Sequence, residues 1–135
     1  MYFQAVRGAI TVEEDKPEEI IEKTTILLKK ILDENNLSYQ DIVSIIFSST
    51  RDIKSQYPAV AARNMGMTQI PLFCCQEMFV EGSLEKCIRI LMHIQGTAPR
   101  VIRHIYLEKA KSLRPDLNSM QNHGGCNGKT SDDSN

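Results

Sequence analysis

Residues 84–95 read Leu-Glu-Lys-Cys-Ile-Arg-Ile-Leu-Met-His-Ile-Gln, and the choice between strand and helix for this segment decides the fold class. The even-numbered residues from Ile88 to Ile94 are all apolar, whereas the odd-numbered ones include Arg89 and His93. Such alternation is typical of a strand with one buried face. Helical spacing also fits, because leucine, lysine and methionine favour helices. The alternation is the cleaner pattern and predicts a strand.

The clearest helix lies nearer the amino end of the chain. Asp15-Lys16-Pro17-Glu18 is a start of the capping-box type, with proline in the first turn. The residues that recur at helical spacing after it are Ile20, Thr24, Leu27, Leu28, Ile31 and Leu32. Glutamate and lysine occupy the other side, and Asn35-Asn36 ends the pattern. This amphipathic helix is expected to cover one face of a sheet.

The remaining segments complete the predicted order of elements. Strands are expected at residues 2–12, 42–49, 70–75 and 101–109, a short helix at residues 58–64 before Gly66, and a terminal turn at residues 113–117. The strand at residues 42–49 is mostly apolar and is expected inside the sheet. The order β-α-β-α-β-β-β predicts an α/β or α+β fold with helices on one face of the sheet.

Length and composition exclude several classes of protein. At 135 residues the chain is long enough for a single domain with one core. A formal net charge of −1 gives no overall field for nucleic acid or a membrane surface, so neither is an expected partner. Apolar runs such as Ile45-Ile46-Phe47 are too short to cross a bilayer. No basic-then-apolar signal begins the sequence, and we therefore expect a cytoplasmic protein.

The last part of the chain differs in composition from the rest. Residues 118–135 are rich in glycine, serine, asparagine and aspartate, which predicts a flexible tail after a folded domain at residues 1–117. None of the cysteines, at positions 74, 75, 87 and 126, forms a C-x-x-C pair. His123 and Cys126 have no second pair of ligands, so no metal site is predicted.

Two arginines lie in segments where a charge is unexpected. Arg7 belongs to the run Val6-Arg7-Gly8-Ala9, and Arg89 lies on the less apolar face of the strand predicted at residues 84–95. A guanidinium offers a rigid fork for a carboxylate, so two of them suit a dicarboxylate ligand. Gly8 would let a ligand approach the backbone closely. Arg7 could equally be a charge at a sheet edge that deters aggregation, and the alternative for Arg89 is a solvated residue at an edge.

Other polar residues also have two interpretations. A solvated glutamate and a half-buried strand tyrosine are common, yet Glu77 and Tyr106 could each bind a polar ligand. His93 and His104 have no acidic partner nearby in the sequence and are expected to be packing or surface residues. No nucleophile–histidine–acid set, glycine-rich phosphate loop or pair of carboxylates is evident in the sequence.

Several short motifs occur in a fixed order: Arg7-Gly8-Ala9, Cys74-Cys75-Gln76-Glu77-Met78, Cys87-Ile88-Arg89, Arg103-His104-Ile105-Tyr106-Leu107-Glu108-Lys109 and Leu113-Arg114-Pro115-Asp116-Leu117. In these motifs residues 3–117 resemble the monofunctional chorismate mutases of the Bacillus type. The resemblance implies an isomerase that converts chorismate, a dicarboxylate, to prephenate on the route to phenylalanine and tyrosine, without cofactor or metal. It also implies a mixed five-stranded sheet, with a strand at residues 84–95, in a homotrimer. The sheets would form a barrel-like core, with sites at subunit interfaces.

The resemblance further implies how the substrate is held. Arg89 would be the cation beside the breaking ether oxygen. Glu77, with Cys74, would orient the ring hydroxyl, and Arg7 and Tyr106 would bind the side-chain carboxylate. Arg7, Glu77 and Arg89 are therefore the expected catalytic residues. Catalysis would consist of restricting the substrate conformation and stabilising charge in the transition state.

The resemblance also implies residues at the edge of the cleft. Tyr57 would form an aromatic wall, and Arg63 and Arg114 would lie at the mouth, although both arginines could equally be solvated. Arg114 is expected to be mobile. Val60 stands where the family often has lysine, and Phe73 stands where it has a small polar residue, so a large ring could narrow the pocket.

Two other functions fit the same architecture. Small trimeric imine deaminases share the implied fold and use an interface arginine, but they would not need the Cys-x-Gln-Glu or Arg-His-x-Tyr motifs. A trimer that binds a carboxylate ligand without turnover is the second alternative. Turnover of chorismate distinguishes all three.

Overall fold

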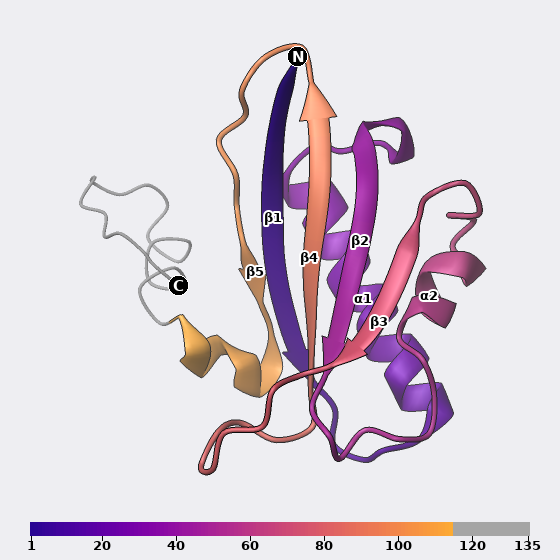
Figure 1. Cartoon of the computed structure of the whole chain (residues 1–135), viewed down its shortest axis with the longest axis vertical. Helices are drawn as coiled ribbons and strands as arrows, with labels where there is room; N and C mark the ends of the chain where they lie inside the picture. Colours follow the sequence, from indigo (N-terminus) through magenta and orange to yellow (C-terminus); the bar gives the residue numbers. More distant parts are fainter. Residues whose placement is uncertain (115–135) are drawn as a thin grey trace.

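The computed structural model describes residues 1–114, so the tail predicted at residues 118–135 lies outside the described residues. The elements in chain order are β1 (Tyr2–Thr11), α1 (Pro17–Glu34), the 3-10 helix η1 (Tyr39–Asp41), β2 (Ile42–Ser49), α2 (Ala59–Asn64), β3 (Leu72–Gln76), β4 (Cys87–Gly96), β5 (Ile105–Tyr106) and the 3-10 helix η2 (Glu108–Leu113). The strands form one five-stranded sheet in the order β3-β2-β4-β1-β5 (Figure 1).

The central strand is β4, which confirms the strand predicted from the alternating pattern. It pairs antiparallel with β1 on one side and with β2 on the other. The edge strands β3 and β5 are parallel to β2 and β1, respectively, so the sheet is mixed, as expected. Ile88, Ile90, Met92 and Ile94 are all buried, whereas Arg89 and His93 are partly exposed.

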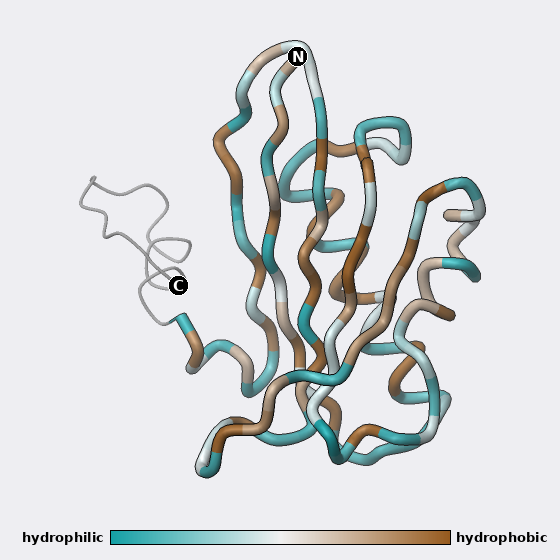
Figure 2. Tube along the Cα trace, in the orientation of Figure 1, coloured by the Kyte–Doolittle hydropathy of each residue, from teal (hydrophilic) through white to brown (hydrophobic). Residues whose placement is uncertain are grey.

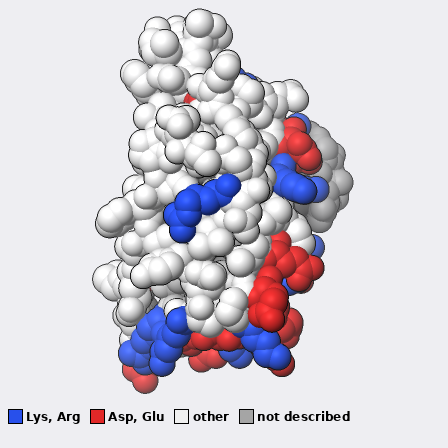
Figure 3. All heavy atoms as spheres, turned by 90° about the vertical axis from the view of Figure 1, so that its right-hand side faces the viewer, with Lys and Arg blue, Asp and Glu red and all other residues white. Residues whose placement is uncertain are grey.

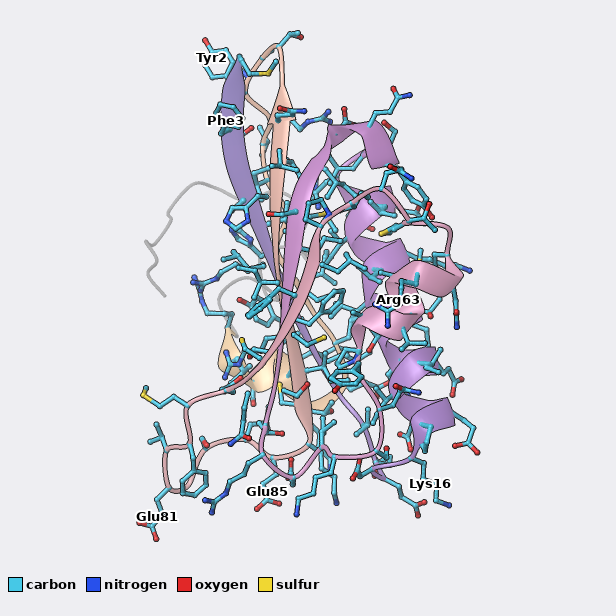
Figure 4. All side chains as sticks on the ribbon, turned by 45° about the vertical axis from the view of Figure 1, so that its right-hand side comes forward. Tyr2, Phe3, Lys16, Arg63, Glu81 and Glu85 are labelled. Atoms are coloured by element: carbon cyan, nitrogen blue, oxygen red, sulfur yellow. The ribbon has the colours of Figure 1, made fainter. Side chains whose placement is uncertain are left out.

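Both α-helices lie on one side of the sheet (Figure 4), as predicted. Leu27, Leu28 and Ile31 of α1 are fully buried in the core that the helices and the sheet enclose. Hydrophobic residues run along the middle strands of this sheet (Figure 2). We call the side of the sheet that faces away from α1 and α2 the open face. Within residues 1–114, no helix is long and apolar enough to cross a membrane.

Gly8 brings the helix and the edge strand close to β1. A Cβ atom on Gly8 would lie 2.9 Å from Cδ1 of Ile31 on α1 and 3.1 Å from the carbonyl oxygen of Ile105. We expected Gly8 to admit a ligand. Its missing side chain instead admits α1 and β5, although its backbone also lines the cavity described below.

The predicted capping box at the start of α1 is wrong. The N-cap residue is Lys16, which makes no side-chain cap hydrogen bond, although Pro17 does begin the helix. Asp15 instead accepts hydrogen bonds from the backbone N–H groups of Lys54, at 3.0 Å, and Ser55, at 3.1 Å. The carboxylate therefore anchors the loop after β2 and is not available to the helix.

The last strand is much shorter than the predicted 101–109. Of residues 101–109, only Ile105–Tyr106 form a strand, β5, which pairs with β1. Glu108 has a φ of 55°, and this left-handed conformation turns the chain out of the sheet and into η2. The turn predicted at residues 113–117 lies mostly outside the described residues, and Leu113 ends η2.

The connection from β4 to β5 is anchored to the carboxyl end of α1. The Asn35 side chain accepts a hydrogen bond from the Arg103 N–H at 2.8 Å and donates one to the Arg103 carbonyl at 3.0 Å. Arg100 donates to the carbonyl oxygens of Asn35 and Asn36, each at 3.2 Å. Terminal carbonyls of a helix need such partners. The contacts fix where β5 begins.

Candidate active site

A cavity of about 340 Å³ lies on the open face of the sheet. Its polar lining residues are Arg7 from β1, Ser48 from β2, Arg89 from β4, Tyr106 from β5 and Arg114, which follows η2. The structure therefore brings together four residues that the sequence analysis assigned to one site. Ser48 was not among them.

Arg7 and Arg89 reach the cavity from neighbouring antiparallel strands. Arg7 is opposite Leu91, and Arg89 is opposite Ala9. Opposed residues share a face of the sheet, and every second residue returns to that face. Both arginines therefore project from the open face, and both are half-buried. Two guanidinium groups on one face suit a ligand with two carboxylates.

Glu77 holds one end of the Arg89 side chain. Nε of Arg89 donates to Oε1 of Glu77 at 2.7 Å, and the Glu77 side chain is only 18% exposed. The Glu77 N–H donates to the Ser49 carbonyl at 2.8 Å, which fixes the backbone just after β3. Nη1 and Nη2 of Arg89 have no hydrogen bond or ion pair within residues 1–114. That end of the guanidinium can therefore meet a ligand.

Tyr106 lines the cavity although it is only 5% exposed. It packs in a small buried cluster with Ala9, Cys87 and Ala110. The strong burial of Cys87 raises the pKa of its thiol to about 11, so this cysteine stays protonated and serves as a packing residue. The cluster holds the tyrosine ring in place at the wall of the cavity that the two arginines also line.

His104 supports Arg7 from the edge strand. The backbone N–H of Arg7 donates to Nδ1 of His104 at 2.9 Å, so this nitrogen carries no proton. Burial lowers the pKa of His104, and the positive charges of Arg7 and Arg114 lower it further. The imidazole is thus a neutral acceptor among cations. Its role depends on a contact between distant segments, which the sequence did not reveal.

The other three predicted site residues lie elsewhere. Tyr57 and Cys74 line a second cavity of about 390 Å³ between the loop after β2 and β3. Arg63 is on α2, on the helix side of the sheet (Figure 4). Burial raises the pKa of the Cys74 thiol, while the Ala59 backbone and the Arg63 charge partly oppose that effect. Cys74 is therefore a thiol beside α2, and not a nucleophilic thiolate.

One chain consequently contains two separate clusters. Arg7, Glu77, Arg89, Tyr106 and Arg114 form the first, which we call the arginine cluster. Tyr57, Arg63 and Cys74 form the second, which we call the α2 cluster. No residue is common to the linings of the two cavities. The single site expected from the sequence is therefore not assembled within one chain.

Val60 and Phe73, the two residues that depart from the family pattern, do not obstruct the arginine cluster. Phe73 is opposite Ile46 on the edge of the sheet, is 65% exposed, and does not line its cavity. Val60 is half-buried on α2. A narrowing of the pocket by Phe73, which we considered from the sequence, is not seen in the single chain.

The chemistry available to the arginine cluster is electrostatic. It offers guanidinium groups, a tyrosine hydroxyl and a carboxylate, all of which bind polar groups in fixed positions. Within residues 1–114, no group of three or more histidine, cysteine, aspartate or glutamate residues is placed to hold a metal ion. His123 and Cys126 lie outside the described residues.

Comparison with known proteins gives a consistent result. Residues 3–117 match the family described as chorismate mutase type I. The chain is 46% identical over 124 residues to chorismate mutase AroH of Bacillus subtilis, which covers 90% of this chain and 98% of that protein. It is 46% identical over 120 residues to chorismate mutase AroH of Thermus thermophilus, which covers 87% and 98%, respectively.

A solved structure agrees with these sequence matches. The chorismate mutase from Clostridium thermocellum superposes with a TM-score of 0.78 at 46% identity, covering 81% of this chain and 98% of the other. Both the sequence and the fold are therefore shared over nearly the full length of the relatives. The chain belongs to the chorismate mutase type I family.

Proposed function

We propose that this protein catalyses the intramolecular rearrangement of chorismate to prephenate in phenylalanine and tyrosine biosynthesis. As a member of the chorismate mutase family it is an isomerase. The observation that carries the proposal is the placement of Arg89, which Glu77 holds in a cavity that Arg7, Tyr106 and Arg114 also line. These groups match the two carboxylates, the hydroxyl and the ether oxygen of chorismate.

Arg89 is proposed to act on the ether oxygen of the substrate. In the rearrangement the C–O bond breaks while a C–C bond forms within the same molecule, and no proton is exchanged. Negative charge grows on the ether oxygen because C–O cleavage runs ahead of C–C formation. The Nη groups of Arg89, whose Nε is held by Glu77, would bind this charge more tightly in the transition state than in the ground state.

The other residues are proposed to hold chorismate in a folded conformation. Arg7 and Tyr106, which line the cavity, would bind the side-chain carboxylate. Glu77 does not line that cavity but holds Arg89 there, and it would accept a hydrogen bond from the ring hydroxyl. Cys74 would contact the same hydroxyl. Restricting the substrate in this way removes much of the entropic cost of reaching the transition state.

The active form is proposed to be a homotrimer with sites at the subunit interfaces. Cys74 belongs to the α2 cluster, so a neighbouring copy must bring its Tyr57, Arg63 and Cys74 to the arginine cluster of the first. Two observations support an interface near the α2 cluster. Tyr57 and Phe73 are 67% and 65% exposed in the single chain. Figure 3 shows a broad face that is mostly uncharged, with an isolated basic side chain near its middle and the other charged side chains along its lower end and right-hand edge. Large exposed apolar side chains are typical of contact surfaces.

We also propose that the protein works in the cytoplasm. Cys74, Cys75 and Cys87 are all free thiols, and a reducing compartment keeps thiols in that form.

The proposed function is tested by incubating the purified protein with chorismate. Loss of the chorismate absorbance, together with appearance of prephenate among the products, is the expected result. A matched sample with Arg89→Ala controls for uncatalysed rearrangement. Binding without turnover would favour a carboxylate sensor, and deamination of an imine substrate without chorismate turnover would favour the deaminase alternative.

A further inference from the structure

Ser48 lies between the strands that carry the reacting groups. It is directly opposite Arg89 on β4 and in register with Cys75 on β3. Its side chain is half-buried and lines the same cavity as Arg7 and Arg89. A residue in this place can contact both Arg89 and the residues that follow β3.

We propose that Ser48 is a positioning residue that orients the Glu77 carboxylate for the rearrangement, an inference that rests on the proposed function. Oγ of Ser48 donates to Oε1 of Glu77 at 3.1 Å. The same oxygen accepts the hydrogen bond from Nε of Arg89 at 2.7 Å. Within residues 1–114, the carboxylate accepts only these two hydrogen bonds, so Oε2 is left for the hydroxyl of the substrate.

Two donors are needed because the terminal torsion of glutamate is soft. Rotation about the last side-chain bond has broad minima, and a single donor would not fix the plane of the carboxylate. Arg89 and Ser48 reach Oε1 from neighbouring strands, so the two donors together restrict the rotation of the carboxylate more than either would alone. Because Arg89 is itself held by Glu77, the serine hydroxyl supports both groups. Preorganisation of this kind is what electrostatic catalysis requires.

The backbone of Glu77 is fixed by the residue next to Ser48. The Ser49 carbonyl accepts the Glu77 N–H at 2.8 Å. Consecutive residues of β2 therefore hold Glu77, one by its backbone and one by its side chain. Ser49 acts through its carbonyl, which any residue supplies, whereas the role of Ser48 requires a hydroxyl.

An isosteric pair of variants separates the hydroxyl from side-chain size. Ser48→Thr keeps the donor, and Ser48→Val replaces it with a methyl group of nearly equal volume. We expect kcat/KM for chorismate to fall about tenfold in Ser48→Val, as is usual for loss of a hydrogen bond to a charged group, and to stay near wild type in Ser48→Thr. Ser48→Ala should resemble Ser48→Val without adding bulk. Ser44→Ala, on the same strand and face, is the control, because Ser44 contacts His93 and does not line the cavity.

A double-mutant cycle with Glu77→Ala tests whether Ser48 acts through Glu77. In the Glu77→Ala background, Ser48→Val should lower kcat/KM by no more than about twofold, because the hydroxyl then has no carboxylate to orient. Equal rates for Ser48→Thr and Ser48→Val would overturn the proposal. So would a loss in the Glu77→Ala background as large as in the wild type, or a fall in thermal stability with unchanged kinetics. Absence of turnover by the wild type would instead overturn the proposed function, and with it this inference.

Discussion

The backbone N–H of Arg7 and Nδ1 of His104 are joined by a 2.9 Å hydrogen bond between residues 97 positions apart in the chain. Arg7 and His104 directly precede the residues through which β1 and β5 pair. Here the acceptor of the hydrogen bond is an imidazole nitrogen, where a strand pair would use a backbone carbonyl. The bond requires a neutral ring. The charge state of His104 is therefore coupled to the position of Arg7.

This coupling predicts the pH dependence of the enzyme. Burial and the neighbouring arginines lower the pKa of His104 below its ordinary value of 6.5. As the pH falls, the unfolded chain takes up this proton before the folded protein does. The stability that neutral His104 contributes to the folded protein is therefore fully present above the ordinary pKa. It is lost as the pH falls through the lowered pKa. Unfolding by urea at a series of pH values measures it.

Activity is expected to fall at the same low pH at which His104 becomes protonated. The reaction transfers no proton to the enzyme, so kcat should be nearly flat between about pH 6 and 8, without an appreciable solvent deuterium effect. Below that range kcat/KM should fall in the wild type and less steeply in His104→Asn, whose amide oxygen accepts a hydrogen bond but does not titrate. A bell-shaped profile with a large solvent isotope effect would instead indicate general acid–base catalysis.

Gly8→Ala is expected to lower the free energy of unfolding by about 1–3 kcal/mol, because the new methyl group must displace α1 or β5. Its Cβ would lie 2.9 Å from Ile31 and 3.1 Å from the Ile105 carbonyl. Gly96→Ala is the matched control in β4, since its nearest contact would be an ordinary 3.7 Å. Both are compared with wild type by urea unfolding at one protein concentration. Equal stability of the two variants would show that the close packing at Gly8 is not needed.

Arg114→Ala is expected to raise KM several-fold with a smaller fall in kcat. Arg114 lines the cavity but does not contact the breaking bond in our proposal, so it contributes mainly to substrate binding. Lys111→Ala on the exposed side of η2 is the control. Ending the chain after Leu117 should leave both constants unchanged, and ending it after Ser112 should reproduce Arg114→Ala. Identical kinetics for the two truncations would refute a binding role.

Mixed trimers test whether the two clusters come from different copies. The variant Arg89→Ala removes a side chain from the arginine cluster, and Arg63→Ala removes one from the α2 cluster. If sites are shared and each variant alone is inactive, trimers assembled from equal amounts of the two variants contain intact sites, and about one quarter of wild-type activity should return. Arg7→Ala mixed with Arg89→Ala should recover almost none, because each arginine cluster then carries one lesion. Equal recovery in both mixtures, or an active monomer by sedimentation, would contradict shared sites.

Much of the fold could be predicted because it depends on local periodicity. The alternation in β4 identified a strand and its buried face, although not its central position, and the apolar spacing in α1 identified the side that packs on the sheet. The same alternation placed Arg89 away from the core. Strand ends were harder to predict. The chain leaves the sheet at Glu108, which has a positive φ, and the composition of the segment does not predict that conformation.

The site could be predicted only in part because its contacts join distant segments. Motif resemblance singled out Arg7, Arg89 and Tyr106, which do share a cavity. The hydroxyl of Ser48 and the ring of His104 gained their contacts only when β2 and β5 were placed beside other strands. A linear pattern also cannot tell which site residues meet within one chain.

Replacement of Arg89 tests the central claim most directly. If its guanidinium stabilises charge on the ether oxygen, Arg89→Ala should lower kcat by about 10²–10³ or more while the protein remains folded. Arg89→Lys should restore little, because an ammonium carries all its donors on one nitrogen and cannot reach both Glu77 and the substrate as the extended guanidinium fork does. Steady-state kinetics with chorismate, with circular dichroism to confirm folding, provides the measurement. A folded Arg89→Ala enzyme with nearly normal kcat would contradict the account.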